Sequence, residues 1–493
     1  MSKRRPLRIA IIGAGPGGLC MAIKLAEAGF EDVVLFEKSD RIGGTWNHNR
    51  YPGCACDVQS ELYSFSFDVN TSWSRPYAPQ PEILAYLDRV AERHGVLARC
   101  RFGLEVERAV WSDACAEWTL ALGDGSTHAA DVVVSALGMF NDLAHPDIPG
   151  LEDFSGACFH TAKYDWGHDL AGRRVAVIGS AASAIQMVPE IVKIAGHVDY
   201  YQRTANWVLP KEDDPYSEET LRRRAVDPSL VLARRDEIYE TIDTGTAFLD
   251  ETRRAELEAV GRKAIEVVED PVLREKLLPT HPWGCKRPLF SNDYYPSFNR
   301  PNLELVTDPI ERVTKSGVVA GSRLRPVDTL VLATGFKANR YLSAIDVRGR
   351  GGLAIADAWK EGAQAFLGVS TTGFPNLFQL YGPNTNNGSI ITMIEFQVDH
   401  VVELVRRIAD ERLAWLDVRA DVMAEYNEAI QKAIANVTVW QASCNHYYAS
   451  DSGRIVTQYP HSMSTFKQAL AAVGPEAYEI GPRVENEPVA TGS

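Results

Sequence analysis

The sequence lacks the features that mark a membrane or nucleic-acid-binding protein. Its 493 residues contain no apolar stretch long enough to cross a bilayer, and the basic start at 1–5 leads into a glycine-broken segment, unlike a signal peptide. It also lacks a basic surplus, because 51 Lys and Arg stand against 65 Asp and Glu, a formal charge of −14. Nucleic acids and anionic membranes are bound largely by Lys and Arg, so we expect neither as a partner.

Cysteines are few, and their spacing is not that of a redox or metal site. The eight cysteines are scattered, with no CxxC pair among them. Cys54 and Cys56 form a CxC, which we interpret as two thiols in a loop. In a chain of this length the pattern predicts reduced thiols and a cytoplasmic protein. It offers no metal site and no cysteine pair suited to a disulfide reductase.

The chain does contain a supersecondary pattern that occurs twice. Residues 9–12 form an apolar run, followed by a glycine-rich turn, a helix-compatible segment and a second apolar run at 33–36. The same order returns with an apolar run at 174–178, a turn of small residues, a helical stretch and 198–202. Strand, glycine turn, helix and strand make up the βαβ unit. The sequence therefore predicts an α/β fold with two Rossmann-like dinucleotide-binding domains.

The first turn has the fingerprint of a dinucleotide site. Gly13, Gly15 and Gly18 match GxGxxG, which permits a tight turn, close approach to a pyrophosphate and close helix packing. Glu37 stands 19 residues beyond Gly18, where a carboxylate can accept a hydrogen bond from a ribose hydroxyl. A glycine motif alone is often a simple turn, but strand, helix, strand and acid are all in place here. The pattern indicates a bound dinucleotide.

The second turn favours a different nucleotide. Ala181 and Ala184 replace two of the glycines expected after Gly179, and both are small enough to serve. Its second strand leads to Arg203 and Thr204 instead of an acid. A guanidinium binds a 2′-phosphate that a carboxylate would repel, which favours NADPH over NADH; the alternative is a solvated arginine at a strand end. Two such units predict one tightly bound FAD and one exchanging nicotinamide.

The same features divide the chain into parts. The stretch 211–280 is rich in Glu, Arg and Ala, which predicts a helical insertion, and the Gly- and Asn-rich segment 381–389 indicates a ligand-lining loop. The expected parts, in chain order, are FAD-binding (1–145), NADP-binding (146–210), the helical insertion (211–280), NADP-binding again (281–340) and FAD-binding again (341–493).

A segment after the first βαβ unit resembles a family signature. Residues 43–57 read GGTWNHNRYPGCACD, which is similar to the Baeyer–Villiger monooxygenase pattern of Gly-x-Trp, four residues, Tyr-Pro-Gly, three residues and Asp. A second signature of that family, Phe-x-Gly-x-x-x-His-x-x-x-Trp, falls at 154–164, with His160 in place and Tyr164 where the Trp is expected. Residues 444–448 lie where some members have a Ser-Trp-Tyr segment.

The resemblance implies an FAD- and NADPH-dependent monooxygenase that inserts one atom of O2 into a ketone through a C4a-peroxyflavin, giving an ester or lactone. It implies that Arg287, paired with Asp57, is the catalytic guanidinium, and that His160 couples domain movement to turnover. The implied FAD contacts are Gly13, Gly15, Gly18, Glu37, Gly44, Thr45, Trp46, Asp57 and Tyr63. The implied NADPH contacts are Gly179, Ala181, Arg203, Thr204 and Lys286.

Two alternative functions stay open at this point. Tyr164 at the Trp position favours the neighbouring flavin-containing monooxygenases, which oxygenate nitrogen or sulfur. A flavoprotein reductase or oxidase would also bind FAD and NADPH, without transferring oxygen. The pair of Asp57 and Arg287 has a purely structural interpretation too, as a buried salt bridge.

Overall fold

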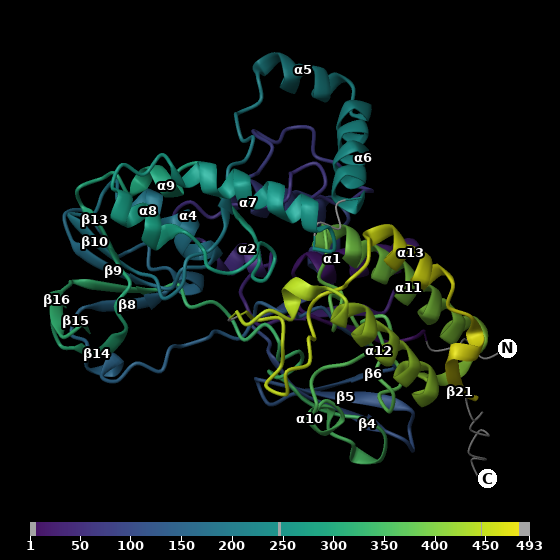
Figure 1. The fold of residues 1–493 in the computed structure, drawn as a ribbon. Coiled ribbons are helices and arrows are strands. Elements are labelled where there is room, and N and C mark those ends of the chain that lie inside the picture. The colour runs from purple at the N-terminus through teal and green to yellow at the C-terminus, as the bar shows by residue number, and fades with distance from the viewer. Residues whose placement is uncertain (1–5, 245–247, 445, 483–493) are drawn as a thin grey trace, which may run out of the picture.

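Two parallel sheets, one in each lobe of the molecule, form the framework of the fold (Figure 1). The computed structural model describes residues 6–244, 248–444 and 446–482. The first sheet has the strand order β19-β7-β1-β2-β3, and the second has the order β13-β10-β9-β17-β8. Their pairings are parallel throughout, which confirms the predicted α/β fold with two Rossmann-like units.

The strands of both sheets are short apolar runs. The first sheet consists of β1 (Ile9–Ile12), β2 (Val33–Glu37), β3 (Cys100–Phe102), β7 (Val132–Ser135) and β19 (Leu377–Gln379). The second consists of β8 (Ala157–His160), β9 (Arg174–Ile178), β10 (His197–Tyr201), β13 (Leu303–Val306) and β17 (Thr329–Leu332). Every residue of β1, β7 and β17 is buried, because helices and loops cover both faces of a parallel sheet.

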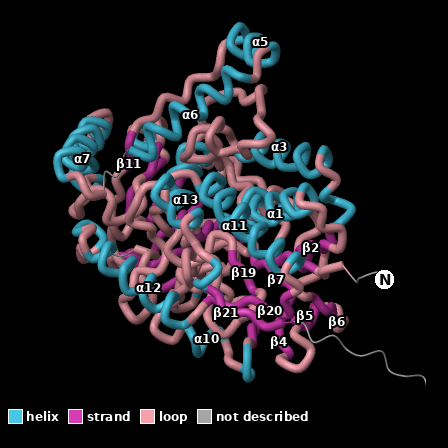
Figure 2. Tube along the Cα trace, turned by 90° about the vertical axis from the view of Figure 1, so that its right-hand side faces the viewer, coloured by secondary structure: helices cyan, strands magenta, loops and turns pink. Residues whose placement is uncertain are grey.

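Helices α1 (Pro16–Glu27) and α11 (Ile390–Asp410) pack against each other beside the first sheet (Figure 2). α1 begins with Pro16, a position where the missing N–H of proline removes no helical hydrogen bond. α11 buries an apolar face that includes Val398, Val401 and Val405. In the second lobe, α4 (Ala182–Ile191) follows β9 in the same way that α1 follows β1.

Between the strands β11 (Val208–Leu209) and β12 (Leu289–Phe290) the chain forms helices that contact both lobes. They are α5 (Glu218–Val226), α6 (Ser229–Thr244), α7 (Glu251–Ile265) and α8 (Pro271–Leu277). α5 and α6 project at the top of Figure 1. Arg235 of α6 is buried, with its guanidinium 3.2 Å from the Glu395 carboxylate of α11. α7 lies close to β11, since a Cβ at Gly261 would come within 2.7 Å of the Trp207 ring.

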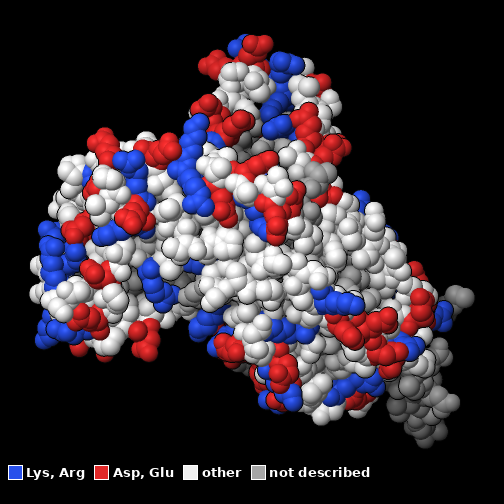
Figure 3. Space-filling view, viewed as in Figure 1, with Lys and Arg blue, Asp and Glu red and all other residues white. Residues whose placement is uncertain are grey.

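The remaining elements surround this framework. They are α2 (Thr45–His48), α3 (Gln80–Arg93), β4 (Val106–Ser112), β5 (Glu117–Leu122), β6 (Thr127–Ala130), α9 (Tyr294–Ser297), β14 (Ile310–Thr314), β15 (Gly317–Ala320), β16 (Arg323–Pro326), β18 (Asp346–Arg348), α10 (Ile355–Ala358), β20 (Leu413–Val418), α12 (Ala420–Ala435), α13 (Met463–Ala471) and β21 (Tyr478–Pro482). Within the described part of the chain, no helix is both long and apolar enough to span a bilayer. Acidic and basic side chains are intermingled over the face shown in Figure 3.

A buried carboxylate lies on β20, in the two-stranded antiparallel sheet that β20 forms with β21. Asp417 is 5% exposed and accepts hydrogen bonds from the backbone N–H of Gly373 at 3.0 and 3.2 Å. Burial raises the pKa of Asp417 to about 7, although the Gly373 N–H and Arg350 oppose the shift. The folded chain therefore binds this proton more tightly than the unfolded chain, whose carboxyl has an ordinary pKa. Stability from this residue falls as the pH rises from about 4 to about 7.

Changing Asp417 to Asn should stabilise the protein more at pH 8 than at pH 5.5, because the amide oxygen can still accept the Gly373 N–H without a buried charge. We expect the melting temperature at pH 8 to rise by at least about 2 °C, with a smaller gain at pH 5.5. Calorimetry at both values measures the difference. Asp421→Asn, at an exposed position four residues on, is the control. Equal pH dependence in the two variants would contradict the assignment.

Candidate functional site

One large cavity joins the two glycine turns. Its volume is about 1780 Å³, more than the 300–1,000 Å³ typical of a site for one small ligand. All but one of the site residues predicted from the sequence line it: Gly13, Gly15, Glu37, Gly44, Thr45, Trp46, Asp57, Tyr63, Gly179, Ala181, Arg203, Thr204, Lys286 and Arg287. The other predicted residue, Gly18, packs beneath the turn, where a Cβ would lie 1.9 Å from the Gly13 carbonyl oxygen.

The first turn forms a cradle made of backbone. Gly13 has a φ of +102°, and a Cβ on it would lie 2.8 Å from the carbonyl oxygen of Ala136. A Cβ on Gly44 would lie 2.8 Å from the Cα of Gly15, so two glycine loops touch at the cavity wall. No side chain caps the N-terminus of α1, which leaves its N–H groups for a ligand. This arrangement fits a pyrophosphate.

Glu37 fixes the first turn from the end of β2. Its carboxylate accepts hydrogen bonds from the backbone N–H of Ala14 and of Ser39, each at 2.9 Å. Each oxygen keeps a lone pair, so the carboxylate can also accept a bond from a ribose hydroxyl in the cavity. The sequence predicts the hydrogen bond to a ribose hydroxyl. It carries no sign of the two bonds from the backbone N–H groups of Ala14 and Ser39.

The second turn places two cations side by side. Gly179 has a φ of +119°, and a Cβ there would lie 2.2 Å from the carbonyl oxygen of Ala333. Lys286 donates a hydrogen bond to the Thr204 hydroxyl at 2.7 Å. Burial lowers the pKa of Lys286, and the neighbouring charge of Arg203 lowers it further. Since neither cation forms an ion pair with another described residue, a phosphate dianion fits between them.

Asp57 and Arg287 form an ion pair across the two lobes. Asp57 follows α2 in the first lobe, Arg287 precedes β12 in the second, and their side chains meet at 3.2 Å. The Asp57 side chain is 9% exposed, whereas 43% of Arg287 is accessible because it faces the cavity. Burial raises the pKa of Asp57, and the charges of Arg287 and Lys211 oppose this. Burial also disfavours the charge on Arg287, but Asp57 keeps its pKa above the ordinary value.

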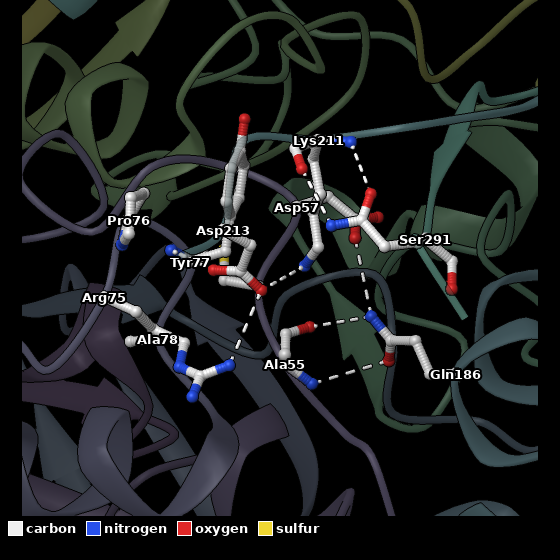
Figure 4. A network of polar contacts seen from close by, with 12 residues as sticks. Ala55, Asp57, Arg75, Pro76, Tyr77, Ala78, Gln186, Lys211, Asp213 and Ser291 are labelled. Atoms are coloured by element: carbon white, nitrogen blue, oxygen red, sulfur yellow. Dashed lines mark hydrogen bonds and ion pairs between the residues drawn. The ribbon is translucent and has the colours of Figure 1, made fainter. Parts of the chain in front are cut away.

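Gln186, which no sequence motif marks, connects this pair to the second lobe. Its side-chain N–H donates to the Ala55 carbonyl at 3.0 Å and to Asp57 at 3.4 Å (Figure 4). Its carbonyl accepts from the Tyr51 hydroxyl at 2.8 Å. Gln186 lies on α4, one turn beyond the second cluster of small residues, so α4 both borders the nucleotide turn and positions the loop that carries Asp57.

Aromatic residues complete the wall around the ion pair. The Trp46 indole N–H donates to the Tyr63 hydroxyl at 3.0 Å. Tyr447 lies close to Arg287, whose charge opposes the rise that burial causes in the Tyr447 pKa, and the Tyr381 hydroxyl donates a hydrogen bond to Asn386 at 2.8 Å. The loop 381–389 thus lines the cavity as its composition indicated, while the contact of Tyr447 with Arg287 had no sequence signal.

His160 ends β8 and does not line the cavity. Its Nδ1 accepts a hydrogen bond from the backbone N–H of Ala162 at 3.1 Å. Burial and the neighbouring His145 lower the pKa of His160 to about 4. The imidazole is therefore neutral near pH 7, and its hydrogen bond shapes the connection that leaves β8.

The expectation that all cysteines are reduced is wrong. Cys285 and Cys444 form a disulfide, with their Cα atoms 6.4 Å apart and a sequence separation of 159 residues. The other six cysteines are free. Spacing along the chain could not show this pair, because the two segments meet only after the chain has crossed from the second lobe back to the first.

Two dinucleotide-type turns on one cavity, with a guanidinium fixed between them, define a two-cofactor oxidoreductase. A family profile described as pyridine nucleotide-disulphide oxidoreductase matches residues 10–242. A Baeyer–Villiger monooxygenase of Pseudomonas aeruginosa is 39% identical over 97% of this chain and 92% of its own length. An FAD-binding monooxygenase of Aspergillus niger is 36% identical over 94% of this chain and 80% of its own.

Solved structures are similar over nearly the whole chain. Cyclohexanone monooxygenase from Rhodococcus sp. Phi1, bound to NADP⁺, superposes with a TM-score of 0.89 at 30% identity, covering 98% of this chain and all of that one. The chain belongs to the Baeyer–Villiger monooxygenase family.

Changing Gln186 to Leu should loosen the loop at 51–57, because the Ala55 carbonyl and the Tyr51 hydroxyl lose their partner. Leaving such buried groups unpaired costs about 1–3 kcal/mol, so the melting temperature should fall. Hydrogen exchange followed by mass spectrometry should show faster exchange in peptides that cover 51–57. Gln468→Leu, at an exposed site on α13, controls for the substitution itself; identical exchange in both variants would show that Gln186 does not hold the loop.

Proposed function

We propose that this chain is an FAD- and NADPH-dependent monooxygenase that inserts one atom of O2 into a ketone, giving an ester or lactone. The observation that carries the proposal is the ion pair of Asp57 and Arg287 in the wall of a cavity shared by two dinucleotide-type turns. A reductase that only passes electrons has no use for a guanidinium fixed at that place. The partners are a small-molecule ketone and O2.

The two sheets support a division of the chain between the cofactors. We assign 1–145 and 341–493 to FAD, since β19 completes the sheet that β1 and β7 begin. We assign 146–210 and 281–340 to NADP, since β8, β9, β10, β13 and β17 form one sheet, and 211–280 to an insertion between its halves.

The first turn and the segment after it suit FAD. Gly13, Gly15 and the N-terminus of α1 would bind the pyrophosphate, with Gly18 allowing the close helix packing. Glu37 would accept a ribose hydroxyl. The remaining assigned contacts are Gly44, Thr45, Trp46, Asp57 and Tyr63, which line the cavity beyond the turn.

The second turn suits NADPH. Gly179 and Ala181 lie at the N-terminus of α4, where the backbone can approach the pyrophosphate. Arg203, Thr204 and Lys286 form the group that would bind the 2′-phosphate, because a hydroxyl and two cations that form no ion pair within the described residues converge there. NADH lacks that phosphate and would leave the cations unsatisfied.

Arg287 is the residue that we assign to the oxygen transfer. Bound FAD, once reduced by NADPH, supplies the activation of O2. The guanidinium stays charged beside Asp57 and would stabilise negative charge as it develops on the ketone oxygen. Asp57, positioned by Gln186, would orient the guanidinium toward the cavity, and the aromatic wall would exclude water.

The acidic surplus supports the absence of a nucleic-acid or anionic-membrane partner. The six free cysteines support a cytoplasmic location.

The function itself is tested with a panel of cyclic, linear and aryl ketones under isotopically labelled O2. An ester carrying one labelled atom supports the proposal. Labelled sulfoxide or N-oxide alone, or only peroxide, would replace it with heteroatom oxygenation or with an oxidase.

Changing Arg287 to Ala should leave the bleaching of FAD by NADPH intact while ketone oxygenation falls by about a hundredfold or more. The reason is that only the second step develops charge beside the guanidinium. Anaerobic spectrophotometry measures the first step, and ester formation measures the second. Arg287→Lys, which keeps the charge without the planar donors, should recover part of the rate. Oxygenation near the parent rate in the Ala variant would remove the assigned role.

Changing Arg203 to Ala should raise the Michaelis constant for NADPH by at least about tenfold and leave that for NADH nearly unchanged, since the lost contact is to the 2′-phosphate. Steady-state oxidation of each nucleotide provides the comparison, with Arg203→Lys as the charge-conserving control. If both constants rose equally, Arg203 would not be the 2′-phosphate ligand.

A further inference from the structure

The disulfide joins two segments that each carry a residue of the cavity wall. Cys285 directly precedes Lys286 and Arg287 in the loop before β12. Cys444 lies shortly before Tyr447, which lies close to Arg287 on the cavity wall. The cross-link therefore fastens the C-terminal segment to the loop that positions both cations. Neither the mechanism above nor the family signatures require it.

The two sulfur atoms differ in accessibility. Cys285 is fully buried, whereas Cys444 is partly exposed. Around Cys285 the packing is aromatic: Phe248 stacks on Trp283 with ring centroids 5.6 Å apart, and a Cβ on Gly284 would lie 2.8 Å from Phe248. A small thiol approaching from solvent would therefore reach the sulfur of Cys444 before that of Cys285.

We propose that Cys285–Cys444 is a thiol–disulfide exchange site, opened at Cys444 by a small dithiol, and that its state sets how firmly Lys286 and Arg287 are positioned. The exchange itself is independent of the proposed function; its effect on NADPH binding depends on that function. The ligand class is a dithiol in the reducing direction and a hydroperoxide in the oxidising direction.

In the reducing direction a thiolate of the dithiol attacks Sγ of Cys444, the bond to Cys285 breaks, and Cys285 leaves as a thiolate that takes up a proton. The second thiol of the reductant then displaces Cys444, so two electrons and two protons pass to the protein and the reductant becomes a disulfide. In the oxidising direction hydrogen peroxide accepts two electrons from the two thiols, giving the disulfide and two molecules of water.

The closed disulfide keeps Tyr447 against Arg287 and the Lys286 loop beside Thr204. When it is open, the C-terminal segment stays in place through non-covalent contacts, such as that between Tyr447 and the neighbouring Arg287. The reduced protein should therefore bind NADPH more weakly, by about fivefold or more, which is the lower range for coupling between two sites. It should also release more peroxide per NADPH, because a loosened wall admits water.

The exchange is tested first without any activity measurement. The denatured, unreduced parent should incorporate six alkyl groups, because two of its eight cysteines are paired, and eight after treatment with dithiothreitol. The native protein is then equilibrated in dithiothreitol buffers of successively lower redox potential. The number of alkyl groups per chain should rise from six to eight while the fold stays intact. Hydrogen exchange in peptides covering 284–287 and 446–448 should rise in step. Eight alkyl groups in the air-oxidised parent, or a pair that opens only on unfolding, would overturn the proposal.

The consequence is tested by titrating NADP⁺ against the holoenzyme in both states. Cys285→Ser and Cys444→Ser should each match the reduced parent and no longer respond to dithiothreitol. Cys115→Ser and Cys158→Ser remove exposed free thiols and should keep the full response. An affinity that is equal in the oxidised and reduced parent would show that the pair does not position the cations. Failure of the parent to oxidise NADPH at all would instead refute the proposed function and leave the exchange standing.

Discussion

The structure depends on one ion pair between its two lobes. A carboxylate as buried as Asp57 lowers stability unless it is paired and hydrogen-bonded, and Arg287 and Gln186 supply those contacts from the other lobe. Since the described hydrogen-bond and ion-pair partners of the Asp57 carboxylate lie in the other lobe, the pair holds the two lobes together at the cavity. The cavity follows from that constraint, because the glycine turns at the starts of α1 and α4 then face a common space. The same cavity therefore serves both nucleotide binding and oxygen transfer.

Much of the framework could be predicted from the sequence because its signals are local. Strands such as β1 and β17, buried on both faces, appear as continuous apolar runs. Each nucleotide turn begins with a glycine, Gly13 or Gly179, in a backbone conformation that only glycine adopts readily. The long helix α11 was missed, although its buried valines recur at helical spacing. The Gly- and Asn-rich loop directly before α11 favours irregular structure, so the apolar periodicity that begins at Ile390 was assigned to the same irregular region.

The site residues likewise divide into those that local sequence motifs predict and those that only the folded structure shows. Gly13, Glu37 and Arg203 were found because each occupies a fixed position relative to a βαβ unit. Gln186 and Tyr447 were missed because they act across the lobes, where only the folded chain brings them to the ion pair. The disulfide is the extreme case: its cysteines have a sequence separation of 159 residues, and neither lies in a spaced motif. Long-range contacts of this kind have no signature in one sequence.

The central claim is that Asp57 and Arg287 act as one unit in oxygen transfer. A double-mutant cycle with Asp57→Ala and Arg287→Ala, scored by the rate of ester formation from a ketone, tests it most directly. Residues that act as a unit give strongly non-additive losses, so the double variant should be little slower than Arg287→Ala alone. Losses that add in free energy would show that the two side chains contribute independently, and would contradict the account.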